Sequence, residues 1–188
     1  MPAEVLGNVA LNCRTLIFPG MGLVDPDAMQ LVLRMARRGS FVLLESCAGF
    51  LNPADFASHQ TVFHRHLNLA VGAPVDLWEG ELLRGRANGT DSGTQSLKKA
   101  GWAVTIPYVE YVWPHHMKVR DFSRVVPVKV QSGEAIGWIN GLPVAVKVPV
   151  GKGTLIYLGS PLGPALGAGD REARRWLRSV MEMKPERA

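Results

Sequence analysis

The sequence has little cysteine, no long apolar run and no long basic run. Its 188 residues include two cysteines, Cys13 and Cys47, which are too few for a disulfide framework. Nowhere do about 18 consecutive apolar residues occur, and the first residues lack the basic and apolar segments of a signal peptide. We therefore expect a cytoplasmic protein that does not associate with a membrane.

Charge of one sign is also not concentrated along the chain. The formal net charge is +5, but the lysines and arginines occur in short groups such as Arg37-Arg38 and Arg174-Arg175. A nucleic-acid-binding segment commonly shows a basic run or a basic motif interleaved with aromatic residues. The sequence therefore argues against nucleic acid as a partner.

What is present is the composition of a globular domain. Hydrophobic residues make up 47% of the chain and charged residues 20%. A chain of this length buries about 70% of the surface of its unfolded state in one domain. We expect a single domain over residues 1–188 with a packed core.

The order of apolar segments predicts an α/β fold. Apolar runs at 14–18 and 41–45 flank a helical pattern that Gly39 ends, which is typical of a parallel strand-helix-strand unit. A second helix is expected from Pro53 to about Leu69. Later strands are expected at 102–106, 125–130, 135–139, 144–148 and 154–158, with a hairpin at Asn140-Gly141 and a last helix over 170–183.

A family resemblance rests on the segment from Leu16 to Gly49. The strand-end sequence Phe18-Pro19-Gly20-Met21-Gly22 leads through a helix and an apolar strand to Glu45-Ser46-Cys47-Ala48-Gly49. This pattern resembles the class I glutamine amidotransferase-like superfamily, and within it the biotin-protein ligase N-terminal-like domains and the intracellular cysteine protease and deglycase branch. The resemblance implies a flavodoxin-like three-layer sandwich, with a mostly parallel sheet and added antiparallel strands in the C-terminal half.

The same resemblance implies that Cys47 lies on a sharp turn after a central strand. Backbone N–H groups at such a turn can stabilise a thiolate and an oxyanion. The alternative is that Cys47 is simply a buried core residue, which is common for free cysteine. Where the amidotransferases have a histidine and a glutamate after a late strand, this chain has Ser160-Pro161-Leu162, so the standard triad is not expected.

The candidate catalytic residues are therefore Cys47 as nucleophile, His59 or His66 as base and Glu45 as acidic partner. These histidines can equally be surface residues of an amphipathic helix. No metal or cofactor is expected, because adjacent His115 and His116 point to opposite faces of a strand. Candidate ligand-binding residues near the strand ends are Gly20, Met21, Gly22, Ser46, Ala48, Gly49, Tyr111, Trp113 and Ser160.

Three functions are compatible with these patterns. The first is an amidotransferase-like domain that binds a small polar molecule near Cys47 without the standard triad. The second is a cysteine-dependent hydrolase that uses Cys47 and one of the two histidines. The third is a non-catalytic interaction module that forms a homo-oligomer through an exposed sheet edge.

Overall fold

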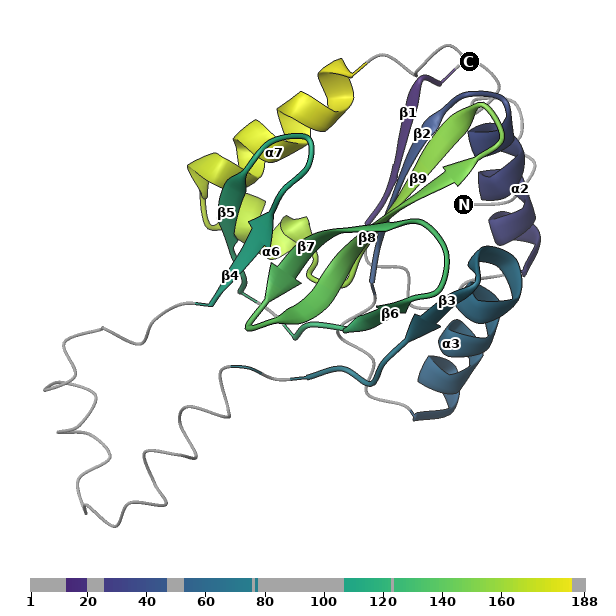
Figure 1. Ribbon diagram of the computed structural model, residues 1–188, viewed down its shortest axis with the longest axis horizontal. Coiled ribbons are helices and arrows are strands. Elements are labelled where there is room, and N and C mark those ends of the chain that lie inside the picture. Colours follow the sequence, from purple (N-terminus) through teal and green to yellow (C-terminus); the bar gives the residue numbers. More distant parts are fainter. Residues whose placement is uncertain are drawn as a thin grey trace, which may run out of the picture.

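The computed structural model describes residues 13–19, 26–46, 53–75, 77, 107–122 and 124–183. Within these ranges the chain forms one seven-stranded sheet, a two-stranded ribbon and four helices (Figure 1). The strand order of the large sheet is β1-β2-β9-β8-β7-β4-β5. The ribbon pairs β3 (Leu69–Val71) with β6 (Val128–Val130).

One half of the large sheet is parallel. It consists of β1 (Thr15–Phe18), β2 (Phe41–Glu45) and β9 (Gly153–Leu158). All five residues of β2 are buried, which is expected of a strand covered on both faces and explains its continuous apolar sequence. The predicted strand-helix-strand unit is confirmed, with α2 (Pro26–Arg37) as its connecting helix.

The other half of the sheet is antiparallel. It adds β8 (Leu142–Val150), β7 (Glu134–Ile139), β4 (Tyr108–Tyr111) and β5 (Met117–Arg120) beside β9. Asn140 and Gly141, which connect β7 to β8, both have positive φ, so the predicted hairpin is confirmed. The strand predicted over 102–106 lies outside the described residues.

Two buried clusters form the core, one on each face of the sheet. The first joins α2 and α3 (Pro53–Leu67) to β2, β8 and β9 through residues such as Val32, Phe63 and Tyr157. The second joins α6 (Leu162–Gly167) and α7 (Arg171–Glu182) to β4, β7 and β9, with Trp176 fully buried. Alternate residues of β2 and β9 contribute to different clusters, as the two-residue period of a strand requires.

The expected flavodoxin-like three-layer sandwich with a mostly parallel sheet is wrong. The sheet is mixed, with two parallel pairings against four antiparallel ones, and it curls into a half-barrel that few helices accompany (Figure 1). On β4 and β5 the face opposite α7 carries exposed polar side chains instead of a described helix. The mostly parallel sheet was implied by the family resemblance, and apolar runs alone do not distinguish parallel from antiparallel neighbours.

Candidate functional site

Part of the predicted catalytic set lies outside the described residues. This applies to Cys47, Ala48 and Gly49 at the predicted turn, and to residues 20–22. His59 belongs to α3, but its side chain is outside the description as well. The proposed roles of these residues are therefore untested by the structure.

Glu45 ends β2 with its side chain on the face that carries α6 and α7. Its Oε1 atom accepts a hydrogen bond from the backbone N–H of Leu162 at 2.9 Å. Leu162 is the first residue of α6, and the preceding Pro161 has no side-chain hydrogen bond to cap that helix. The carboxylate thus satisfies an N–H group that the helix itself leaves unpaired, at the end of the helix dipole that favours negative charge.

Ser46 fastens the end of β2 to the end of β9. Its N–H donates to the Leu158 carbonyl at 2.7 Å, and its hydroxyl donates to the Gly159 carbonyl at 2.9 Å. A Cβ atom at Gly159 would collide with the Val126 carbonyl oxygen and lie 2.8 Å from that of Val144. Position 159 therefore requires glycine, because three backbone segments converge there.

Asp121 is a fully buried residue that was not among the sequence-predicted site residues. It follows β5, and its Oδ1 atom accepts a hydrogen bond from the hydroxyl of Ser160 at 2.7 Å. The signal was present in the alternation of β5, since Met117, Val119 and Asp121 occupy every second position and are all buried. A carboxylate at the next inward-facing position after a strand indicates a buried polar site, because buried carboxylates need hydrogen-bond partners.

Tyr111 lies beside these carboxylates with its ring packed in the core. Burial raises the pKa of its phenol, and the negative charges of Asp121 and Glu45 raise it further. The ring centroid is 4.6 Å from that of Trp176, and a Cβ at Gly137 would lie 2.9 Å from the Tyr111 ring. Tyr111 is therefore a neutral, buried phenol and does not line an open pocket.

Trp113 packs against the second core cluster, and it makes one contact through its backbone carbonyl and one through its ring. Its carbonyl accepts a hydrogen bond from the indole N–H of Trp176 at 2.9 Å. The Lys147 ammonium lies 5.3 Å from the centroid of the Trp113 ring, within cation–π range. These contacts of Trp113 are with other residues of the protein, and they do not test its expected role in lining a pocket.

His66 is not brought to Glu45. Helix α3 packs on the opposite face of the sheet, where the Phe63 and Tyr157 rings meet with centroids 4.9 Å apart. The Glu45 side chain is bonded to α6 on the other face. The expected cooperation of these two residues therefore has no support among the described contacts.

We call Glu45, Ser46, Asp121, Ser160 and Tyr111 the strand-end cluster. The hydrogen bonds described above connect it to β2, β9 and α6 and to the residues after β5. Its carboxylates accept bonds from protein donors and are at most 7% exposed. Among the described residues no group of three or more histidine, cysteine or carboxylate side chains could hold a metal ion. The cluster is a buried, hydrogen-bonded frame that connects the sheet to α6.

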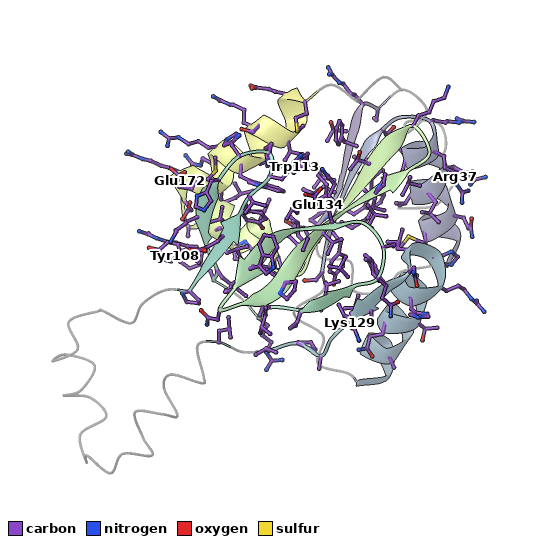
Figure 2. All side chains as sticks on the ribbon, in the orientation of Figure 1. Arg37, Tyr108, Trp113, Lys129, Glu134 and Glu172 are labelled. Atoms are coloured by element: carbon purple, nitrogen blue, oxygen red, sulfur yellow. The ribbon has the colours of Figure 1, made fainter. Side chains whose placement is uncertain are left out.

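A second group of polar residues lies on the opposite, exposed face of β4, β5 and β7. We call it the outer ladder, and it consists of Tyr108, Glu110, Lys118, Arg120 and Trp138. The strand register pairs Tyr108 with Arg120, and it pairs Glu110 with both Lys118 and Trp138. Tyr108 is 38% exposed, and Trp138 is partly exposed. Figure 2 shows Tyr108 on β4, at the side of the molecule away from α2 and α3.

One ion pair lies within the outer ladder. Lys118 Nζ lies 2.5 Å from Glu110 Oε1. This hydrogen bond and the positive charge of Lys118 lower the pKa of the Glu110 carboxyl, so that it is ionised at neutral pH. The outer ladder thus offers an accessible surface with aromatic rings, one carboxylate and two cations.

Comparison with solved structures finds proteins that contain a similar fold. The chain is similar to a β-galactosidase from Bacillus circulans sp. alkalophilus, with a TM-score of 0.56, 12% identity and coverage of 92% of this chain and 23% of the enzyme. It is similar to a β-galactosidase from Halorubrum lacusprofundi, with a TM-score of 0.58, 15% identity and coverage of 94% and 23%. It is also similar to a cytoplasmic protein from Salmonella typhimurium LT2, with a TM-score of 0.59, 16% identity and coverage of 98% and 76%.

The chain therefore spans about a quarter of the length of the β-galactosidases that it matches. No protein-family model and no curated protein sequence matches it. In the described part of the chain, no helix is long and apolar enough to cross a membrane.

These findings correct the expected family and function. The resemblance to the class I glutamine amidotransferase-like superfamily is contradicted by structural matches that are glycoside hydrolases. The expected amidotransferase-like or cysteine-dependent hydrolase activity is therefore not supported. The short Cys-x-Gly and Pro-Gly motifs carried the resemblance, and such motifs recur by chance on unrelated backbones.

Proposed function

We propose that this chain is a carbohydrate-related domain that binds a saccharide on the outer ladder and does not itself cleave it. The structural likeness supports the carbohydrate class, since it covers over nine-tenths of this chain and a domain-sized part of each β-galactosidase. At 12–15% identity that likeness concerns the fold, so the enzymes' reaction and substrate are not carried over.

The observation that carries the proposal is the pairing of two accessible aromatic rings with charged neighbours. Tyr108 and Trp138 are diagonal neighbours on the same sheet face, because the residue between them, Glu110, is paired with Trp138. The C–H face of a sugar ring packs on an aromatic face through dispersion and the ring quadrupole. Charged groups beside the rings can accept or donate hydrogen bonds to sugar hydroxyls.

The burial and the hydrogen bonds of the described carboxylates favour sugar binding over hydrolysis. Glycoside hydrolysis uses two carboxyl groups that flank the scissile bond and reach it from both sides. Glu45 and Asp121 are buried and accept hydrogen bonds from Leu162 and Ser160. The exposed Glu110 is bonded to Lys118 and is the single carboxylate of the outer ladder. Among the described residues, these arrangements suit recognition of a sugar more than protonation of a glycosidic oxygen.

Calorimetric titration with lactose and with β-1,4-mannobiose tests the proposal. We expect one of the two to bind with a Kd on the order of 1 mM or tighter, as a small exposed site allows. Trp138→Ala should weaken that binding about tenfold or more, because it removes the stacking surface. Trp138→Phe, which keeps a ring, should retain part of it.

The control is Met181→Ala, which removes a 49% exposed apolar side chain on α7 instead of on the outer ladder. Chemical denaturation of each variant shows whether the fold is kept. Absence of binding by either sugar, or an equal affinity in wild type and in folded Trp138→Ala, refutes the proposal. Residence in the cytoplasm and homo-oligomer formation remain predictions from the sequence.

A further inference from the structure

Four arginines lie along one face of α7. Arg171, Arg174, Arg175 and Arg178 are all exposed, and their spacing of three, four and seven residues places them on one side of a helix. The opposite side is fixed in the core by the buried residues Ala173, Trp176 and Val180. With a rise of 1.5 Å per residue, the row is about 10.5 Å long. We call these four residues the arginine face.

The arginine face is unfavourable for the helix that carries it. Its first two members lie in the first turn of α7, where the helix dipole disfavours positive charge, and the last turn contains no basic residue. Glu182, the last residue of the helix, also has the wrong sign for its position. Asp170 caps the helix start by accepting from the N–H groups of Glu172 and Ala173, which offsets part of this cost.

Helix α2 provides the contrast within the same molecule. Its exposed arginines, Arg34 and Arg37, lie in the last turn, where positive charge is favourable for the dipole. Helix stability alone therefore accounts for the placement of the α2 arginines. It does not account for the α7 arginines, which points to a role outside the folding of the helix.

The positive charge continues beyond α7. Arg120 of β5 lies beside the start of the helix, with its Nε 3.9 Å from Asp170 Oδ2. Within α7, Glu172 forms an ion pair with Arg175 at 2.8 Å. Arg171, Arg174 and Arg178 have no ion pair with another described residue. Figure 2 shows Glu172 and Arg37, which mark α7 and α2, on opposite sides of the molecule.

We infer that the arginine face binds an anionic oligosaccharide, through carboxylate or sulfate groups on successive sugar rings. This inference rests on the proposed carbohydrate function for the class of ligand. Guanidinium groups match carboxylate and sulfate oxygens with paired N–H donors, and a row of them on a rigid helix suits a ligand whose charges repeat along a chain. The arginine face would select charged glycans, while the outer ladder stacks neutral rings.

A nucleic acid is less suited to this surface. Proteins that bind single strands combine basic groups with exposed aromatic rings on which the bases stack. The one aromatic residue of α7 is Trp176, which is fully buried and donates its indole N–H to the Trp113 carbonyl. The arginine face therefore provides charge without a stacking platform.

The test compares two variants with equal loss of charge. Arg171→Gln, Arg174→Gln and Arg178→Gln are combined in one variant, and Arg34→Gln, Arg37→Gln and Arg38→Gln in its control on the other side of the sheet. The probe is tetragalacturonate, titrated into the full chain in 50 mM and 200 mM salt. We expect the α7 variant to bind about 10-fold to 100-fold more weakly than wild type and to lose most of the salt dependence. The α2 control should bind like wild type.

The opposite outcomes overturn the inference. An equal loss in the α2 control would show attraction by net charge alone. Tighter binding of a 12-nucleotide DNA strand or of phosphatidylserine vesicles than of tetragalacturonate would assign the surface to another partner. Absence of tetragalacturonate binding by wild type would also refute it.

The two proposals fail separately. Loss of tetragalacturonate binding in the α7 variant, with no binding of lactose or mannobiose to wild type, refutes the outer ladder and keeps the arginine face. The converse result is that wild type binds a neutral disaccharide, that Trp138→Ala abolishes this binding, and that tetragalacturonate does not bind. It refutes the arginine face and keeps the outer ladder.

Discussion

Tyr108 and Tyr111 lie three residues apart on β4, yet they occupy opposite environments. Tyr108 is exposed on the outer ladder, while Tyr111 is buried in the strand-end cluster beside two carboxylates. The glutamates differ in the same way. Glu45 is buried and caps α6, whereas Glu110 is exposed and bonded to a lysine. Residues of the same type are thus buried within hydrogen bonds on one face of the sheet and exposed to solvent on the other.

The contrast teaches that burial decides what a polar group can do here. In the strand-end cluster each hydrogen bond replaces water that the group has lost, so removing a partner leaves an uncompensated polar atom. On the outer ladder water competes with every pair, so the same loss is mostly compensated. The cluster should therefore control stability, and the ladder should control binding.

The largest effect is expected from Ser160→Ala. This variant removes the hydroxyl that donates to buried Asp121 and leaves the carboxylate without that donor, which should lower the free energy of unfolding by about 2 kcal/mol. The matched control is Ser179→Ala, whose hydroxyl lies on the surface of α7, and it should change stability by less than about 0.5 kcal/mol. Denaturant unfolding measures both. Equal stabilities would show that the cluster does not hold the strand ends.

An intermediate effect is expected from Tyr111→Phe at high pH. Because the pKa of Tyr111 is raised in the folded state, the unfolded chain loses this proton first, above pH of about 10. Stability is therefore intact below that pH and falls as pH rises, by up to about 1.4 kcal/mol per pH unit from this group. Tyr111→Phe should remove the contribution of this phenol to the decline in the free energy of unfolding between pH 10 and 11. Parallel curves for wild type and variant would contradict the burial of an intact phenol.

The smallest effect is expected from Lys118→Met on the outer ladder. The pKa of Glu110 is lowered by its hydrogen bond to Lys118 and by the charge of that lysine, so the variant should raise this pKa toward the ordinary value. The stabilising contribution of this ionised carboxyl is present above its unfolded pKa and is lost as pH falls through the folded one. A carboxyl titration followed by NMR measures the shift, and 0.5 M salt should reproduce part of it in wild type. An unchanged pKa would show that the pair is not formed in solution.

Local sequence patterns predicted several elements correctly. The positive φ values of Asn140 and Gly141 agree with the predicted hairpin, and the apolar spacing of α7 agrees with its buried face. The short strands β3, β4 and β5 and the helix α6 were missed. Each contains only three to six residues, too few for a hydrophobic period to stand out from its surroundings.

The site was predicted less well than the elements. Glu45, Ser46, Tyr111 and Ser160 were chosen as members of a reactive crevice, and the structure brings them together as a bonded frame. Asp121 was not chosen, although it continues the inward positions of β5. The helical pattern over 170–183 predicted arginines on the side opposite the apolar residues, and the exposed arginines of α7 agree with this, although no function was assigned to them.

The sequence by itself determined which positions point inward and which point outward, because strand and helix periods are local properties of the chain. Only the tertiary structure decided that a glutamate of β2 caps a helix 117 residues further on, and that a serine after β9 bonds an aspartate after β5. Those pairings depend on strand order and on the curl of the sheet. Long-range packing sets both of these, and no local spacing of residues encodes them.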